Sequence, residues 1–218
     1  MSSHVTRARA LPSHHVAIKS GFWGERQATN RNATLPAVYH QMKLTGRLDA
    51  WKLDWKPGQK PPHIFWDSDT GKWIEAVGFS LASYPNPEFE KQVDEVVDLI
   101  EKAQQADGYV NIFFSAVEPQ NRWKNMRDLH ELYDAGHLIE GAVAYAQATG
   151  KPKLLNVMRR YADHIDSRFG PREGQRRGYC GHPEVELALV KLYQATGEKR
   201  YLDLSKYFID ERGQQPHY

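Results

Sequence analysis

A recurring segment constrains the fold of this chain more than any other feature of its sequence. Residues 134–150 read DAGHLIEGAVAYAQATG, and residues 180–197 read CGHPEVELALVKLYQATG. In both copies a Gly-His pair precedes an apolar stretch, the stretch ends at Gln-Ala-Thr-Gly, and an amphipathic segment follows. Fixed recurrence of a two-helix unit is typical of stacked or toroidal helical folds. The repeat therefore predicts helical hairpins in which a histidine opens the first helix of each unit.

Two weaker copies of the corner extend this series toward the N-terminus. Residues 39–48 (YHQMKLTGRL) resemble the corner that begins at Tyr193, and residues 83–89 (SYPNPEF) fall where a further corner is expected. These corners predict an all-α toroid of about four helical hairpins. A closed double ring of helices takes about six hairpins. We therefore expect an incomplete ring that a C-terminal continuation or a partner subunit closes.

The chain divides into two parts by its periodicity. Residues 1–20 include His4, His14 and His15 but no helical pattern, and they predict an extended N-terminal arm. Residues 21–218 carry the hairpins and predict one partial α/α-barrel domain. A chain of 218 residues is long enough for a domain with a substantial core.

Start and stop signals predict the first helices. A helix is expected over residues 21–34, and Pro36 is expected to restart a second helix. Residues 51–65 are rich in proline and tryptophan and predict a long loop. Either Ser68 or Asp69 is expected to cap the helix that follows.

The apolar patterns of the later helices differ in a way that predicts two layers. Residues 88–104 place their apolar side chains on one helix face, whereas residues 138–148 and 185–193 are apolar nearly all round. Alternation of these two types predicts an outer ring of helices packed on an inner ring. Between them, residues 109–124 predict a second aromatic loop or a short strand. The one-sided stripe consists of Phe89, Val93, Val96, Val97 and Ile100.

Composition excludes several classes of protein. The 29 basic and 27 acidic residues are interspersed and leave a net charge of +2, so no nucleic-acid partner is expected. A single cysteine, Cys180, excludes an internal disulfide or a metal site of several thiolates within the chain. No signal peptide or membrane-spanning run is apparent, and we expect a cytoplasmic protein without a membrane partner. Six Trp and eleven Tyr residues favour a cleft that receives a sugar.

Two histidines are the leading candidates for substrate binding. His137 and His182 recur at matching places, and an imidazole facing a central cavity can bind a hydroxyl group or transfer a proton near neutral pH. The alternative is that each histidine only caps or packs against its helix. Glu184 suits the positive end of a helix and can also bind a sugar hydroxyl. Cys180 is either a nucleophile beside His182 or an inert buried thiol.

A second set of candidates lies between two tryptophans. Asp67 and Asp69, with Lys72 and Glu75, concentrate ionisable groups at the mouth of a helix. We predict that Asp67 and Asp69 bind substrate; the alternative is a capping aspartate on a solvated face. No catalytic residue and no metal ligand is assigned from these patterns.

Five motifs in order give the chain a family resemblance. They are residues 21–23 (GFW), 68–76 (SDTGKWIEA), 105–109 (QADGY), 130–140 (HELYDAGHLIE) and 181–189 (GHPEVELAL). With these motifs the sequence resembles glycoside hydrolase family 127, the β-L-arabinofuranosidase family. The resemblance covers about residues 20–218.

The resemblance implies both an architecture and a chemistry. It implies an (α/α)6 barrel followed by β-sandwich domains, and retaining hydrolysis of terminal arabinofuranosides by a zinc-bound cysteine nucleophile with a glutamate acid/base. It also implies that His137 and His182 contact the sugar. The family's zinc ligands, nucleophile and acid/base fall beyond the end of this sequence, and Cys180 does not match the nucleophile. We therefore expect the isolated chain to be incomplete and inactive.

Two other functions remain open on the sequence. One is an α/α-barrel sugar epimerase or unsaturated-uronyl hydrolase, in which paired histidines, or Asp67 and Asp69, transfer protons without a metal. The other is a non-catalytic helical-repeat module that binds glycans through a concave aromatic face.

Overall fold

Three helices that pack side by side form the inner layer of the molecule. They are α3 (Trp66–Ser83), α6 (Glu131–Thr149) and α8 (Val185–Thr196), with α6 in the middle. The computed structural model describes residue 11 and residues 15–215, and its regular elements are all helical. The predicted arm at residues 1–20 lies largely outside the described residues.

Glycine allows α3 and α6 to approach each other closely. A Cβ atom on Gly71 would lie 2.6 Å from the backbone carbonyl of His137, and one on Gly141 would lie 2.7 Å from the backbone oxygen of Gly71. Any side chain at these two positions would push the helices apart. This contact fixes the spacing of the inner layer at the end that carries the predicted site residues.

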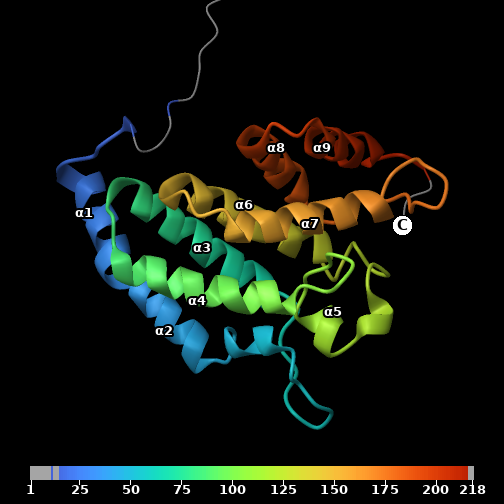
Figure 1. Ribbon diagram of the computed structural model, residues 1–218, viewed down its shortest axis with the longest axis horizontal. Helices are drawn as coiled ribbons and strands as arrows, with labels where there is room; N and C mark the ends of the chain where they lie inside the picture. Colours follow the sequence, from blue (N-terminus) through green and yellow to red (C-terminus); the bar gives the residue numbers. More distant parts are fainter. Residues whose placement is uncertain (1–10, 12–14, 216–218) are drawn as a thin grey trace, which may run out of the picture.

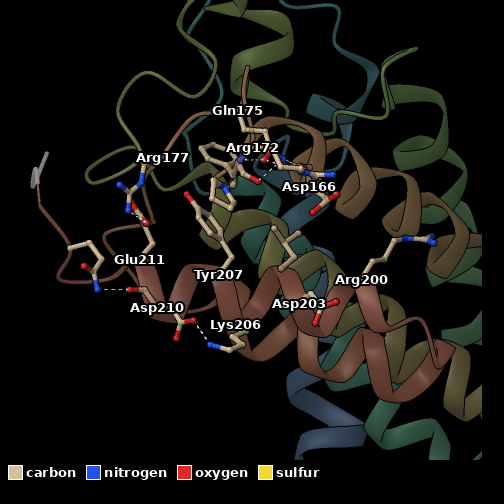
Figure 2. Close-up of a pocket in the computed structure, with 15 residues that line it drawn as sticks. Asp166, Arg172, Gln175, Arg177, Arg200, Asp203, Lys206, Tyr207, Asp210 and Glu211 are labelled. Atoms are coloured by element: carbon tan, nitrogen blue, oxygen red, sulfur yellow. Dashed lines mark hydrogen bonds and ion pairs between the residues drawn. The ribbon is translucent and has the colours of Figure 1, made fainter.

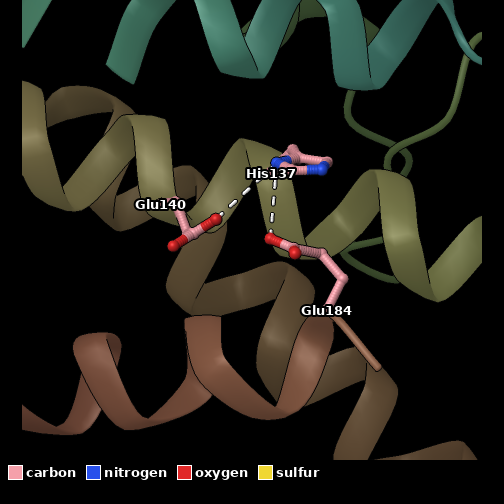
Figure 3. Close-up of side chains that lie close together, drawn as sticks. All are labelled: His137, Glu140 and Glu184. Atoms are coloured by element: carbon pink, nitrogen blue, oxygen red, sulfur yellow. Dashed lines mark ion pairs between the residues drawn. The ribbon is translucent and has the colours of Figure 1, made fainter. Parts of the chain in front are cut away.

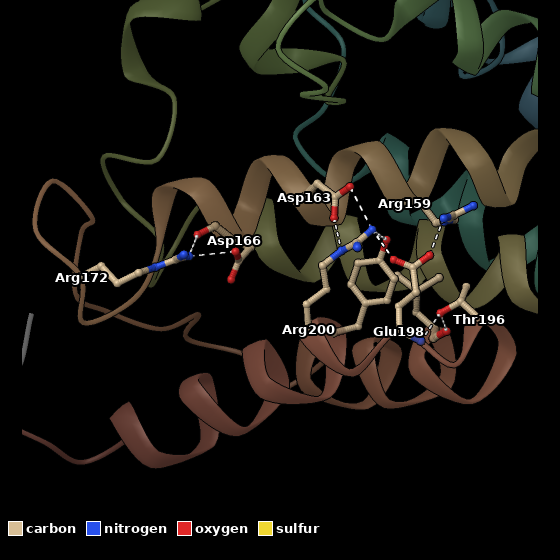
Figure 4. Close-up of polar contacts among 9 residues, drawn as sticks. Arg159, Asp163, Asp166, Arg172, Thr196, Glu198 and Arg200 are labelled. Atoms are coloured by element: carbon tan, nitrogen blue, oxygen red, sulfur yellow. Dashed lines mark hydrogen bonds and ion pairs between the residues drawn. The ribbon is translucent and has the colours of Figure 1, made fainter.

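The outer layer consists of helices with one apolar face, as predicted. These are α4 (Pro87–Ala103), α7 (Lys153–Arg168) and α9 (Lys199–Glu211), and the predicted apolar stripe of α4 is buried. Asn86 caps α4 by accepting hydrogen bonds from the backbone N–H groups of the first turn. In Figure 4, Arg200 of α9 contacts Asp163 of α7 at 2.7 Å, so ion pairs also join two outer helices.

The N-terminal helices form one continuous rod, which corrects the prediction of a restart at Pro36. The rod consists of α1 (Gly21–Thr29), a π-helical turn (Asn30–Thr34) and α2 (Leu35–Leu44). Proline has no N–H to donate and its ring crowds the carbonyl group four residues earlier. The wider π turn, in which the Leu35 N–H reaches back to the Asn30 carbonyl, accommodates that ring without a break.

The repeated Thr-Gly corners have the same geometry, which explains the recurrence in the sequence. At each one the threonine hydroxyl donates to the carbonyl oxygen four residues earlier, and the glycine ends the helix with a positive φ. The O···O distances are 2.6, 2.7 and 2.8 Å at Thr45, Thr149 and Thr196, and φ is 79°, 73° and 74° at Gly46, Gly150 and Gly197.

Two predicted local features differ from the structure. Helix α3 begins at Trp66, so Ser68 and Asp69 lie inside its first turn and do not cap it. Ser68 instead donates its hydroxyl to the Phe65 carbonyl at 2.9 Å. Residues 109–124 form no strand but the short helix α5 (Phe113–Ala116) and a 3-10 turn (Pro119–Asn121).

The layers are open at both ends of the series. The rod of α1 and α2 and the pair of α8 and α9 lie on opposite sides of α3 and α6 (Figure 1). This arrangement confirms the prediction of a partial helical barrel. None of the described helices combines the length and the apolar composition that crossing a membrane requires.

Candidate functional site

The two Gly-His pairs hold different positions relative to their helices. His137 lies in the second turn of α6, which begins at Glu131, whereas His182 lies in the loop before α8, which begins at Val185. The prediction that each pair opens a helix is therefore wrong. Helix α6 starts earlier because buried contacts hold Glu131, whose carboxylate accepts from the backbone N–H of Trp123 at 2.6 Å.

Tyr133 nevertheless brings the two histidines together. Its ring centroid lies 4.5 Å from that of His137 and 4.8 Å from that of His182. The Lys72 ammonium group of α3 donates to the Tyr133 hydroxyl at 2.7 Å and so holds the ring between the imidazoles. Tyr133 precedes His137 by four residues, and that helical spacing was the signal in the sequence that could have identified it.

A cavity of about 240 Å³ lies next to this aromatic group. His182 and Asp69 both line it, and the Phe65 ring stacks on His130 at a centroid distance of 5.5 Å. A second cavity of about 740 Å³, bounded by residues 60–66, shares Phe65 and Asp69 with the first. The residues that line the smaller cavity are Phe65, Ser68, Asp69, Lys72, His130, Tyr133 and His182.

Two of the predicted residues flank the cavity in different ways. Asp69 accepts a hydrogen bond from the Arg47 guanidinium group at 2.8 Å and remains partly exposed. Asp67 is fully buried, and it accepts from the backbone N–H of Ile112 at 2.9 Å. Burial raises the pKa of Asp67 to about 7. Asp67 therefore anchors the loop beneath the site and does not line the cavity.

His137 faces two carboxyl groups (Figure 3). Its Nδ1 atom lies 3.3 Å from Oε1 of Glu184 and 3.6 Å from Oε2 of Glu140. The Lys191 ammonium group contacts Glu140 and also Glu75, the latter at 3.1 Å. Lys191, Glu140 and Glu75 were not predicted as site residues.

The pKa values of His137, Glu184 and Glu140 are shifted in different directions. Burial, with the positive charge of Lys72, lowers the pKa of His137 to about 4, so the imidazole is neutral at neutral pH. Burial and a hydrogen bond with Glu140 raise the pKa of Glu184 to about 8. Burial alone would also raise the pKa of Glu140, but hydrogen bonds from Glu184 and Lys191 bring it below its usual value.

The same three side chains are the candidate for a metal. Among the described residues, only His137, Glu140 and Glu184 form a group of three ligand-type side chains whose donor atoms lie within 4.8 Å of one another. The group does not fit the cysteine-containing zinc site that the sequence resemblance implies. It holds no thiol, and the Lys191 ammonium group already neutralises Glu140. The hydrogen bond between the two carboxyl groups also needs a proton that a metal would displace.

Cys180 does not have the properties of a nucleophile. Its side chain is fully buried, and burial raises the pKa of its thiol to about 11. Its sulfur lies 3.9 Å from Nδ1 of His130 and accepts from the backbone N–H of His182 at 3.4 Å. A neutral, sealed thiol is inert, which supports the structural alternative for this residue.

A further cavity of about 700 Å³ lies between α9 and the loop after α7 (Figure 2). Several of its charged side chains are paired with one another: Arg172 contacts Asp166 at 2.8 Å, and Arg177 contacts Glu211 at 2.8 Å. It holds no histidine and none of the predicted residues. The smaller cavity beside Tyr133 is therefore the candidate site.

Comparison with known proteins finds one family that matches nearly the whole chain. Residues 15–218 match the family described as beta-L-arabinofuranosidase, GH127 catalytic domain. A non-reducing end beta-L-arabinofuranosidase of Bifidobacterium longum subsp. longum is 48% identical over 159 residues, which make up 71% of this chain and 24% of that protein.

Two solved structures of the same family are also similar to this chain. A GH127 beta-L-arabinofuranosidase from Geobacillus stearothermophilus T6 is 45% identical, with a TM-score of 0.87 over 93% of this chain and 33% of that chain. Another GH127 beta-arabinofuranosidase is 36% identical, with a TM-score of 0.89 over 94% of this chain and 34% of that one. The chain thus spans about a quarter to a third of the length of these relatives.

Proposed function

The chain belongs to the GH127 β-L-arabinofuranosidase family, and we propose that it forms part of an enzyme that removes terminal arabinofuranosyl residues from glycans. In this proposal the cavity beside Tyr133 is part of the pocket for the terminal sugar. The similarity to β-L-arabinofuranosidases supports a carbohydrate partner.

One observation supports this assignment above the others. His137 and His182 both contact Tyr133, and His182 lines a small cavity with a carboxylate and an aromatic ring. Sites for small ligands combine apolar and aromatic walls with a few polar groups that fix orientation. The imidazole of His137, whose pKa is lowered by burial, is neutral at neutral pH and can bind a hydroxyl group without the strong hydration of a charge.

We assign the predicted residues distinct roles within this proposal. His182 and Asp69 contact sugar hydroxyls directly, because both line the cavity. His137 lies on the other side of Tyr133, outside the residues that line the cavity, and offers its second ring nitrogen to another hydroxyl of the sugar; Glu184 acts on the sugar only through His137. Asp67 keeps a structural role beneath the site.

No described residue is assigned as nucleophile or acid/base. The Cys180 thiol is sealed and neutral, and the buried carboxyl groups of Asp67 and Glu131 have no access to the cavity. The roles of the zinc-bound cysteine and the glutamate that the family implies are therefore not assigned to any described residue. We expect the isolated chain to bind the sugar without turning over an aryl β-L-arabinofuranoside. Ordinary turnover by the isolated chain would contradict this expectation.

Binding to the isolated 218-residue chain tests the proposal. We expect methyl β-L-arabinofuranoside to shift the imidazole NMR signals of His182 saturably, and His182→Ala to weaken binding at least ten-fold. The matched control is His40→Ala, because His40 is exposed on α2, outside the residues that line the cavity. The proposal fails if no saturable shift occurs, or if both variants bind the sugar equally well.

A further inference from the structure

We propose that the carboxyl pair of Glu140 and Glu184 fixes His137 in one tautomer, with the proton on Nδ1 and a free lone pair on Nε2. His137 would then accept a hydrogen bond from a sugar hydroxyl and would not donate one. That the hydroxyl group belongs to a sugar rests on the proposed function. The tautomer itself is a property of the chain alone.

The positions of two buried atoms support this tautomer. Nδ1 of His137 and Oε1 of Glu184 are both buried, neither has another hydrogen-bond partner, and they lie 3.3 Å apart. Buried polar atoms are nearly always hydrogen-bonded. Two lone pairs facing each other would leave both atoms desolvated and unpaired. A proton on Nδ1 satisfies both atoms at once.

The hydrogen bond between Glu140 and Glu184 holds the other proton of this group. Glu140 carries the negative charge, because the Lys191 ammonium group contacts it directly. Glu184 is the neutral partner, and its proton lies in the hydrogen bond to Glu140. The other oxygen of Glu184, Oε1, faces His137 and carries no proton, so it can only accept a hydrogen bond. His137 must therefore be the donor.

The surroundings keep the imidazole neutral. Lys72 and Glu75 face the group from α3, Tyr133 from α6, His182 from the loop before α8, and Lys191 from α8. Burial and the nearby positive charges lower the pKa of His137 to about 4. In Figure 3 the second ring nitrogen of His137 points away from both carboxyl groups, which leaves it available to a ligand.

His164 provides an internal reference for the same tautomer. Its Nδ1 lies 3.0 Å from the backbone oxygen of Asp107, and its Nε2 lies 3.4 Å from the indole nitrogen of Trp123. A carbonyl oxygen only accepts and an indole N–H only donates, so both contacts require the proton on Nδ1. No carboxyl pair is needed to fix this histidine.

Long-range ¹H–¹⁵N NMR of the full 218-residue chain, labelled at its histidine rings, tests the proposal at pH 7. We expect the Nε2 signal of His137 to be that of an unprotonated nitrogen, as for His164. Glu184→Gln should keep this signal, because the amide donates to Glu140 and its oxygen accepts from His137. Glu184→Leu, which offers neither group, should shift the signal toward the other tautomer.

Each alternative gives a different result in the same samples. A protonated Nε2 in the unmodified chain, or identical spectra for the two Glu184 variants, would overturn the proposal. A stoichiometric shift of His137 on adding Zn²⁺ would replace it with a metal site. Unchanged His164 signals report that each variant is folded. If the tautomer is as proposed but methyl β-L-arabinofuranoside does not bind, the proposed function fails and this inference stands.

Discussion

Two groups of acidic side chains share helix α6 and behave in opposite ways: the first also includes α3, and the second also includes the start of α8. The sealed group, Asp67, Glu131 and Asp134, is at most 1% exposed. The open group, Glu140 and Glu184 with His137 and Lys191, does not line the cavity and reaches the candidate site through the contact of His137 with Tyr133. Backbone N–H groups and a tyrosine hydroxyl hold the sealed group, whereas an ammonium group and an imidazole hold the open one.

The difference comes from what covers each group. Residues 105–130 fold over the sealed group and supply its hydrogen-bond donors. Within the described residues, the open group has no such cover and retains a cation and a neutral histidine. In the sealed group burial outweighs the positive charges of Arg122 and Arg176 near Glu131, which favours protonated acids that hold the surrounding backbone in place. Partial burial with a cation leaves one ionised and one neutral carboxyl group, an arrangement that can orient a ligand-binding residue.

Removing the central acid of the sealed group should have the largest effect. Glu131 accepts from the Tyr109 hydroxyl and from the backbone N–H of Trp123, and Glu131→Leu leaves both donors buried and unpaired. We expect the free energy of unfolding in urea to fall by about 4 kcal/mol. Glu131→Gln, which keeps an acceptor, should lose less than half of that. Equal losses would mean that packing, and not hydrogen bonding, holds this group.

A methyl group at Gly71 should disturb both groups together. Its Cβ atom would lie 2.6 Å from the backbone of His137, so α3 and α6 must separate. We expect Gly71→Ala to lower the free energy of unfolding by about 3 kcal/mol. The control is Gly24→Ala in α1, where the nearest atom is at an ordinary 3.5 Å and alanine favours the helix. A stable Gly71→Ala variant would show that the two groups do not share this contact.

The apolar patterns predicted the layers, and the repeat predicted two histidines of the candidate site but not their surroundings. Thr149-Gly150 and Thr196-Gly197 are local signals, because a hydroxyl four residues after its acceptor and a glycine with positive φ need no distant partner. The one-sided stripe of α4 is likewise a property of one helix. These features could be predicted, and the two-layer arrangement followed from them.

The site depends on contacts between segments that are distant in sequence. Asp67 and Asp69 are two residues apart and have the same side chain, yet the loop that carries Ile112 seals Asp67 and leaves Asp69 at the cavity. Lys191 could not be identified as a site residue from the sequence, because its partner Glu75 is 116 positions away. Its role follows only from the packing of α8 beside α6.

The sealed group should also make stability depend on pH. Burial raises the pKa of Asp67 to about 7 in the folded chain, from 3.8 for a solvent-exposed aspartate. Between these two values the folded state binds more protons than the unfolded state, so stability falls as pH rises. His137 and His164, whose pKa values are lowered, act in the opposite sense up to about pH 6.5. A comparison with Asp67→Asn isolates the acid. We expect the unmodified chain to lose about 2 kcal/mol relative to this variant between pH 5 and pH 7. Parallel urea curves would mean that Asp67 is ionised throughout.

The cation of the open group should contribute least to stability and most to orientation. Lys191 is partly exposed, so losing its contacts with Glu75 and Glu140 in Lys191→Met should cost only about 1 kcal/mol in urea unfolding. Lys199→Met removes an exposed pair with Asp203 and should cost less still.

Without the Lys191 ammonium group, however, Glu140 no longer holds a fixed negative charge, and the proton shared with Glu184 is free to move. The His137 tautomer should then become mixed while the fold survives, because orientation in the open group depends on charge. A loss of stability as large as that of Glu131→Leu would instead make Lys191 part of the framework and remove the distinction between the two groups.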